Sequence, residues 1–351
     1  MDLIHPGSKA EVASALRAAS NESRRLLLVG GRTHMDRGNP CEVDAELWTT
    51  QLDRVIEYDP AEMLVVAEAG IRVGELQRIL GDGGQEWPVD APPDATVGGV
   101  IAAGVSSPRR LRVGHIRDTI VELELVTGDG RAIRSGARTV KNVTGYDIHR
   151  LVTGSLGTLG AIVQVALKVR PLPEARRTLV YAGEGGLTLG RGLLRAVPEA
   201  AAVLASRDRV EVRLEGWAAE VKELTRAART LPVEPYVVEE AAFPVRPVDD
   251  APVVVEAAVP PSAIDRLVDG LQDWTALIGV GLVWLRLSAT DDGALRTIRA
   301  RAAAAGGIAP VIRGSGGLGD VTLPAPQVHG RLTRSFDPAG ILAPGRGWLT
   351  S

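Results

Sequence analysis

The sequence is poor in the residue types that most often bind transition metals. It contains one cysteine, Cys41, and five histidines among 351 residues. A single thiol can form neither an internal disulfide nor the ligand set of an iron–sulfur cluster. The histidines and carboxylates do not cluster at a spacing that would hold a metal ion, so we expect no metal site.

The chain also lacks an excess of charge and any long apolar run. Its 40 basic and 43 acidic residues give a net charge of -3, which offers no field for nucleic acid. No stretch approaches the roughly 20 apolar residues of a spanning helix, and no signal-peptide pattern opens the chain. We therefore expect a cytoplasmic protein without a membrane span, which reaches the inner membrane face only through partners.

Apolar content is high enough for two globular domains, at 45% of 351 residues. Proline and charge mark the boundary between them at 171–177 (PLPEARR). In the first half, the pattern predicts a helix over 8–19 capped by Ser8, strands over 25–31 and 160–169, and a hairpin over 119–135.

The second half alternates strand-like with helical runs. This order predicts an antiparallel sheet covered on one side by helices, of ferredoxin-like type. Strands are expected near 178–182, 209–214, 253–259 and 281–288, and helices near 217–230, 262–274, 293–305 and 328–338.

Glycine is concentrated in three runs of the first half: loop 1 (29–38, VGGRTHMDRG), loop 2 (95–104, ATVGGVIAAG) and loop 3 (154–160, GSLGTLG). Glycine lets main chain approach a ligand closely, and successive N–H groups can form an anion-binding nest. Each loop taken alone is equally well an ordinary turn. Together, they indicate a long phosphate-bearing ligand threaded through main chain.

Two common nucleotide motifs are absent. A Rossmann site needs G-x-G-x-x-G between a strand and a helix. Loop 1 follows a strand, but its spacing is wrong and Gly38-Asn39-Pro40 blocks a helix, while loop 3 precedes a strand. The sequence contains no G-x-x-x-x-G-K-[ST], which excludes a P-loop.

Longer segments resemble the FAD-linked oxidases of the vanillyl-alcohol oxidase type, which carry a PCMH-type FAD-binding domain. The similarity is strongest at 92–110, 113–130, 140–160 and 336–346 (FDPAGILAPGR). Within that family the chain is similar to the FAD-binding subunits of bacterial glycolate oxidases, over essentially its whole length.

The resemblance implies an α+β fold with two domains. Residues 1–173 would form the PCMH-type FAD-binding domain from two α/β subdomains. Residues 178–351 would form an antiparallel-sheet cap, with a tail that returns to the FAD domain. Pro344, Gly345 and Arg346 match the family's closing motif, for which docking is the favoured role over flavin contact.

The resemblance also implies which residues bind FAD. Loop 1 would hold the diphosphate through Gly30, Gly31, Arg32, Thr33 and His34. The family carries small residues here, so Arg32 and His34 depart from the pattern; Arg32 can instead pair with a phosphate. His34 is displaced from the position of covalent attachment, which favours non-covalent FAD. The remaining contacts would come from Pro93, Thr96, Val97, Gly98, Gly99, Ala102 and Gly104 around loop 2, and from Gly154, Ser155, Gly157, Thr158, Gly160 and Ile162 around loop 3.

A K-N-x-x-G-Y-D motif formed by Lys141, Asn142, Gly145, Tyr146 and Asp147 would lie near the flavin ring. Lys141 can stabilise negative charge on the reduced flavin. The alternative for Lys141 and Asn142 is a capped turn before a helix that starts near Tyr146.

Other candidates carry less weight. His115 and His149 are more readily structural than catalytic, and Arg117-Asp118 is expected to be a structural ion pair. Among the tryptophans, only Trp87 is expected near FAD. Trp217, Trp274 and Trp284 are expected in the core of the cap.

We therefore expect an FAD-dependent oxidoreductase acting on CH–OH groups, in a complex that oxidises a small 2-hydroxy acid such as glycolate to glyoxylate. A second FAD-linked oxidase subunit and an iron–sulfur subunit would be its partners. The alternatives are a stand-alone FAD oxidase of another 2-hydroxy acid or an alditol, and a non-catalytic flavin-binding assembly subunit. No catalytic base can be named, and Arg213 and Arg286 on cap strands face either a pocket or solvent.

Overall fold

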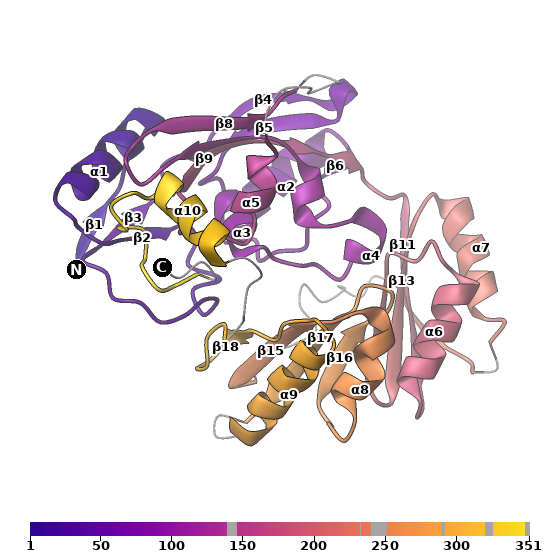
Figure 1. Cartoon of the computed structure of the whole chain (residues 1–351). Coiled ribbons are helices and arrows are strands. Elements are labelled where there is room, and N and C mark those ends of the chain that lie inside the picture. Colours follow the sequence, from indigo (N-terminus) through magenta and orange to yellow (C-terminus); the bar gives the residue numbers. More distant parts are fainter. Residues whose placement is uncertain (139–145, 232, 240–250, 289–291, 320–325, 348–351) are drawn as a thin grey trace. The chain divides into compact units, whose positions relative to one another are not determined.

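The computed structural model describes residues 1–138, 146–231, 233–239, 251–288, 292–319 and 326–347 (Figure 1). Contacts divide the chain into two compact units. Unit 1 comprises Met1–Val105, His115–Pro171 and Asp320–Ser351, and unit 2 comprises Ser106–Gly114 and Leu172–Gly319. Residues 106–114 precede the predicted boundary, yet they group with unit 2 because Leu111 packs against its core.

A three-stranded parallel sheet opens unit 1. In spatial order, its strands are β1 (Asp2–Ile4), β3 (Ala45–Trp48) and β2 (Leu26–Val29). The predicted first helix is confirmed as α1 (Lys9–Asn21), whose N-cap Ser8 accepts a hydrogen bond from the N–H of Glu11 at 3.2 Å. Leu16 of α1 and Leu47 of β3 are buried in one core, which fixes the helix on the sheet.

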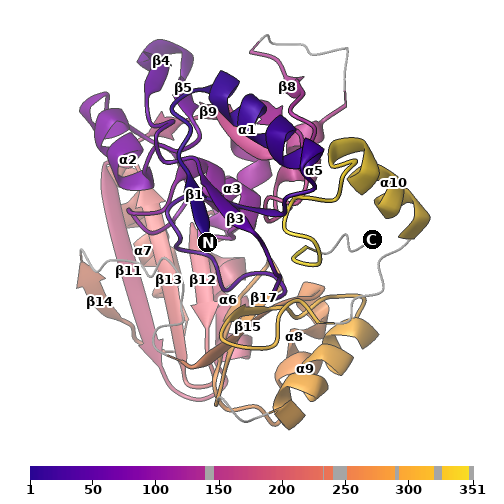
Figure 2. The ribbon, with the colours of Figure 1, turned by 90° about the vertical axis from the view of Figure 1, so that its left-hand side faces the viewer.

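A five-stranded antiparallel sheet forms the larger part of unit 1 (Figures 1 and 2). In spatial order, its strands are β4 (Val55–Asp59), β5 (Leu64–Glu68), β9 (Ala161–Lys168), β7 (Ile120–Val126) and β8 (Ala132–Gly136). The antiparallel pairing of β7 and β8 confirms the hairpin predicted over 119–135.

Short helices and one small strand pair complete unit 1. They are η1 (Pro60–Glu62), α2 (Val73–Asp82), α3 (Val97–Ala103), η2 (Ile116–Thr119), α5 (Ile148–Val152), α10 (Pro326–Phe336), and β6 (Gln85–Glu86) paired with β10 (Arg170–Pro171). Leu76 of α2, Ile101 of α3 and Val152 of α5 are buried in the same core as Leu123 and Val165 of the sheet. This core holds α3, and with it loop 2, in place.

Unit 2 is built on an eight-stranded sheet in which all strand pairs are antiparallel, as predicted for the second half. In spatial order, the strands are β14 (Tyr236–Glu239), β11 (Ala175–Ala182), β13 (Arg209–Gly216), β12 (Ala202–Ala205), β16 (Trp274–Leu277), β17 (Leu282–Leu287), β15 (Val253–Ala258) and β18 (Val311–Arg313). The helical segments are α4 (Arg110–Val113), α6 (Gly186–Ala196), α7 (Ala218–Ala228), η3 (Pro261–Ala263), α8 (Ile264–Val268) and α9 (Asp292–Ala304).

One face of this sheet packs against helices, and the other combines charged side chains with a smaller apolar cluster that includes Leu204, Leu277 and Trp284. Leu193, Val221, Leu267 and Ile298 place α6, α7, α8 and α9 in a single core with alternate strand residues such as Val212. The intervening strand positions face away from these helices and include charged side chains. The helices therefore cover one face only, as the sequence predicted.

Two helical predictions differ from the structure. Only Ile264–Val268 of the range 262–274 is α-helical, and β16 begins at Trp274. α6 was not predicted, because its three glycines lower helix propensity. Gly190 shows their use: a Cβ there would lie 3.0 Å from Cγ1 of Ile278 and 3.3 Å from Cβ of Ala205. Close packing of the helix on the sheet therefore overrides intrinsic propensity.

His149 lies in α5, in the interior of unit 1. Its side chain is buried, and Nδ1 lies 3.3 Å from the hydroxyl oxygen of Ser135 in β8, which also accepts the His149 N–H. Burial lowers the pKa of His149 below the ordinary value of a histidine. The ring is therefore held in its neutral form as part of the packing between α5 and β8.

This burial predicts an acid-dependent loss of stability. As the pH falls below about 6.5, the unfolded chain binds a proton at His149 before the folded chain does, so the free energy of unfolding decreases. We expect the fall in melting temperature between pH 7.5 and 5.5 to be smaller for His149→Gln than for the wild type. His5→Gln, which removes an exposed histidine, is the control. Equal pH dependence of the wild type and His149→Gln would contradict the assignment.

Candidate functional site

A pocket in unit 1 brings the three glycine-rich loops together. It contains about 680 Å³ of space, part of it open to solvent at its mouth. The lining residues are 28–35, Thr49, Gly98, Gly99, Ala102, Ala103, Leu156, Gly157, 160–162 and Arg346.

Loop 1 presents main-chain donors to this pocket. Among the described residues, no acceptor is within hydrogen-bonding reach of the N–H groups of Gly30, Gly31, Arg32 or Thr33. Arg32 has a φ of 59°, a left-handed conformation that is uncommon for a residue with a side chain. Consecutive N–H groups around such a residue form a concave nest for an anion. The loop can therefore bind a phosphate through main chain alone.

A buried carboxylate fixes the strained residue of loop 1. Glu46 in β3 is fully buried and accepts two hydrogen bonds from the Arg32 guanidinium, at 3.0 and 2.8 Å. It also accepts the indole N–H of Trp48 at 2.9 Å, and the guanidinium carbon lies 5.2 Å from the centre of the Trp48 ring. Arg32 thus pairs with Glu46, which anchors loop 1 to β3.

Loop 2 shapes the pocket, and the N–H groups of Gly98 and Gly99 donate hydrogen bonds within the protein. Thr96 caps α3 by accepting the N–H of Gly99 at 3.2 Å, and the N–H of Gly98 donates to the carbonyl of Ala69 at 2.7 Å. A Cβ at Gly98 would lie 2.8 Å from Cβ of Ala69, so that side of the helix packs inward. Gly99 and Ala102, one turn apart, are partly exposed and line the pocket.

Loop 1 packs closely against Thr96 of loop 2 and against Asp94, which precedes loop 2. A Cβ at Gly30 would lie 2.0 Å from the Thr96 hydroxyl oxygen, and one at Gly31 would lie 2.3 Å from the carbonyl oxygen of Asp94. No larger residue fits at either position without moving the neighbouring loop. The glycine pair of loop 1 is thus required for packing as well as for access to a ligand.

Loop 3 is attached to the end of α3. The N–H of Gly154 donates to the carbonyl of Ile101 at 3.0 Å, and that of Leu156 donates to the carbonyl of Ala102 at 2.8 Å. A Cβ at Gly104, where φ is 60°, would lie 2.9 Å from Cα of Gly154. The position of loop 3 therefore follows from the position of loop 2.

The structure separates the predicted residues into two groups. Those that line the pocket are Gly30, Gly31, Arg32, Thr33, His34, Gly98, Gly99, Ala102, Gly157, Gly160 and Ile162. Those that are not among the lining residues, several of which support the loops from behind, are Pro93, Thr96, Val97, Gly104, Gly154, Ser155 and Thr158. The Thr158 hydroxyl donates to the carbonyl of Ser155 at 2.7 Å, whereas the buried Ser155 hydroxyl has no hydrogen-bond partner among the described residues.

The K-N-x-x-G-Y-D motif is only partly described. Lys141, Asn142 and Gly145 lie outside the described residues. Tyr146 is 90% exposed, and Asp147 forms an ion pair with Arg150 at 3.4 Å. Neither of these two residues lines the pocket.

Several side-chain expectations were wrong. Trp87 is fully buried in the core of unit 1, where its indole N–H donates to the Thr119 hydroxyl at 3.0 Å, and it does not line the pocket. Trp274 and Trp284 are buried in unit 2 as expected, but Trp217 is 65% exposed. The Asp118 carboxylate pairs with Arg150 at 3.1 Å and not with its neighbour Arg117.

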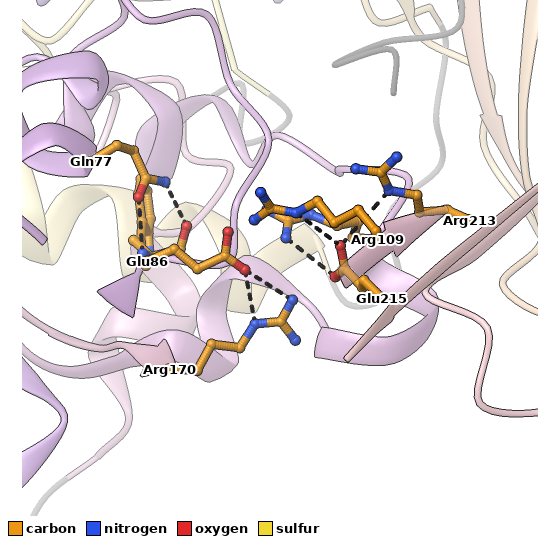
Figure 3. A network of polar contacts seen from close by, with 8 residues as sticks. Gln77, Glu86, Arg109, Arg170, Arg213 and Glu215 are labelled. Atoms are coloured by element: carbon orange, nitrogen blue, oxygen red, sulfur yellow. Dashed lines mark hydrogen bonds and ion pairs between the residues drawn. The ribbon is translucent and has the colours of Figure 1, made fainter. Parts of the chain in front are cut away.

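The face of the unit 2 sheet that its helices leave uncovered carries a buried charged cluster. Figure 3 shows Arg109 and Arg213 directed toward Glu215. Arg109 lies 3.3 Å from the Glu215 carboxylate, and Arg213 donates to the Thr178 hydroxyl at 3.0 Å. Arg213 is thus buried and does not face solvent, while Arg286 pairs with Asp273 at 2.7 Å.

Figure 3 also shows a polar contact of unit 1, in which Arg170 of β10 binds Glu86 of β6 at 3.1 Å. Gln77 of α2 holds the adjacent chain by donating to the carbonyl of Trp87 at 2.6 Å and accepting its N–H at 3.1 Å. These contacts fasten the segment that leads into loop 2.

Two kinds of feature are absent from the described residues. These residues contain no group of three or more histidine, cysteine or acidic side chains arranged to hold a metal ion. No helix among them is both long and apolar enough to cross a membrane.

Comparisons with known proteins agree with this geometry. Residues 3–136 match the sequence profile of a family described as the FAD binding domain. Glycolate oxidase subunit GlcE of Escherichia coli (strain K12) is 29% identical over 338 residues, which is 93% of this chain and 94% of that protein. Glycolate oxidase subunit GlcD of Bacillus subtilis (strain 168) is 29% identical over 181 residues, which is 51% of this chain and 38% of that protein.

Solved structures show the same fold. An alkyldihydroxyacetonephosphate synthase superimposes with a TM-score of 0.71 at 15% sequence identity, covering 97% of this chain and 75% of that one. The mixed α/β architecture with antiparallel sheets is thus shared with that enzyme. Residues 3–136 thus match an FAD binding domain, and the chain is similar along nearly its whole length to a glycolate oxidase subunit.

Proposed function

We propose that this chain is the FAD-binding subunit of a complex that oxidises a small 2-hydroxy acid, with glycolate oxidised to glyoxylate. The observation that carries the proposal is the meeting of three glycine-rich loops at one pocket, in the unit that contains the FAD binding domain match. The similarity to GlcE along 94% of that protein supports the role of a complex subunit.

The pocket fits a flavin dinucleotide by its donor set. The N–H groups of residues 30–33 donate to no acceptor among the described residues, and such free donors suit a diphosphate. Gly99 and Ala102 leave room on the facing side for a flat or extended ligand. Gly157 and Ile162 extend the lining of the pocket to loop 3 and the strand that follows it.

Each of the three loops has its own role in binding FAD. Loop 1 holds the diphosphate through main chain, loop 2 provides shape, and loop 3 with Ile162 closes on the adenosine end. The bound flavin supplies the redox chemistry that side chains lack. Lys141 is proposed to lie by the flavin ring, and binding of FAD is non-covalent.

The chain would work with two partners: a second FAD-linked oxidase subunit and an iron–sulfur subunit. Its single cysteine cannot ligate a cluster, so electron transfer to one needs another chain. We further propose that the complex is cytoplasmic and reaches the inner membrane face through these partners. Copurification followed by flavin and iron counting tests this arrangement. A chain that oxidises glycolate alone, at the rate of the complex, would contradict it.

FAD is expected to bind and stabilise the isolated chain. A ligand at about a hundredfold over its Kd raises the free energy of unfolding by about 2.7 kcal/mol. Thermal melts with increasing FAD should therefore shift upward, and the purified protein should be yellow, with flavin released on denaturation. A colourless protein whose melting temperature does not change when FAD is added would contradict the proposal.

Ala102→Trp is expected to abolish FAD binding by filling the pocket from α3. The indole would occupy space in front of loop 2, and we expect Kd to rise by about a hundredfold or more, which is about 2.7 kcal/mol. Ala10→Trp on the exposed surface of α1 is the matched control. Isothermal titration gives Kd, and melts without ligand check folding. Retained affinity in Ala102→Trp would place the cofactor elsewhere.

Glu46→Gln is expected to weaken FAD binding by about 5- to 30-fold, since it costs about 1–2 kcal/mol in holding loop 1. The amide NH₂ would face the Arg32 donors, and the nest would lose its preferred shape. Glu68→Gln is the matched control, because Glu68 makes an equivalent two-point contact with Arg54, at 3.1 and 2.8 Å, and does not line the pocket. Equal effects of both variants on Kd would remove the special role of Glu46.

A further inference from the structure

The C-terminal tail is built into the wall of the pocket. The N–H of Leu26 donates to the carbonyl of Ile341 at 2.7 Å, and the N–H of Ala343 donates to the carbonyl of Leu26 at 2.9 Å. The tail therefore lies alongside β2, the strand that leads into loop 1. Asp337 fixes the preceding turn by accepting the N–H of Leu342 at 2.8 Å.

Arg346 follows this pairing and joins two loops. Its Nη2 donates to the carbonyls of Met35 and Arg37 in loop 1, at 2.8 Å each. A Cβ at Gly38 would lie 3.0 Å from both Cγ of Arg346 and Cδ1 of Leu156 in loop 3. The Arg346 side chain thus lies between loop 1 and loop 3, and it lines the pocket.

The charge of Arg346 has no counter-ion among the described residues. Arg346 is only 8% exposed, and its hydrogen-bond acceptors are neutral carbonyls. Arg32, the other arginine that lines the pocket, is paired with the buried carboxylate of Glu46 at 2.8 Å. A nearly buried cation without a counter-ion is costly, so an anion bound beside Arg346 would be stabilised.

We propose that Arg346 is the cation that binds the diphosphate of the cofactor, a proposal that rests on the proposed function. Two carbonyls take two of its N–H donors, and the remaining donors of a guanidinium suit phosphate oxygens. The segment it binds, residues 35–37, continues directly from the N–H groups of residues 30–33. The nest and the guanidinium therefore flank one position, where the same phosphate groups are bound by main-chain donors and by charge.

Arg346→Gln separates charge from docking. A glutamine amide keeps donors for the carbonyls of Met35 and Arg37 but carries no charge. We expect its Kd for FAD to rise by about 10- to 100-fold, with an unchanged melting temperature of the ligand-free chain. ADP, which has the diphosphate without the flavin, should lose affinity by the same factor. The dependence of Kd on salt should also become weaker than in the wild type.

Arg334→Gln, an exposed arginine of α10, controls for net charge and should leave both affinities unchanged. Arg346→Lys keeps the charge without the forked donors and should fall between the wild type and Arg346→Gln. It also provides the measurement if the glutamine variant fails to fold.

Two results would overturn the assignment. One is that Arg346→Gln binds FAD and ADP with affinities within about twofold of those of the wild type. If that variant does not fold, the corresponding result is a Kd of the wild type for FAD that does not change with salt. The other is a loss for FAD without a loss for ADP, which would place Arg346 at the flavin. A wild-type chain that binds no FAD would refute the proposed function, a distinct outcome from either.

Discussion

The pocket depends on places where glycine lets one segment of the chain approach another closely. Gly30 and Gly31 lie against Thr96 and Asp94, with a hypothetical Cβ only 2.0 and 2.3 Å from their oxygens. Gly104 meets Gly154 in the same way. Each contact locks one loop onto the next, so the three loops form one unit although they are far apart in sequence. The spacing of N–H donors in the pocket follows from this interlocking.

Charge is distributed around the pocket in a way that suits an anionic ligand. Glu46 neutralises Arg32 from behind while it holds the loop in a left-handed conformation, at a φ of 59°. The charge of Arg32 is therefore used to hold the shape of loop 1. Main-chain donors and the tail arginine remain to meet the ligand. The ion pair between Arg32 and Glu46 thus gives the loop a rigid anchor.

Much of this could be predicted from the sequence, because glycine and turn residues report local requirements. Loops 1 to 3, the Ser8 cap and the hairpin at 119–135 all depend on neighbouring residues. The partnership of Arg32 with Glu46 could not be predicted, since nothing in β3 marks Glu46 as buried. Arg346 was noted only as part of a docking motif, because its place at the pocket depends on pairing between the tail and β2. α6 was missed because its glycines serve packing against Ala205 and Ile278.

The pairing of the tail with β2 joins segments that are far apart in the sequence. Residues 337–347 follow all of unit 2, yet they pair with β2 and place Arg346 in the wall of the pocket in unit 1. A truncation that removes these residues would therefore alter the pocket although all three glycine-rich loops stay intact.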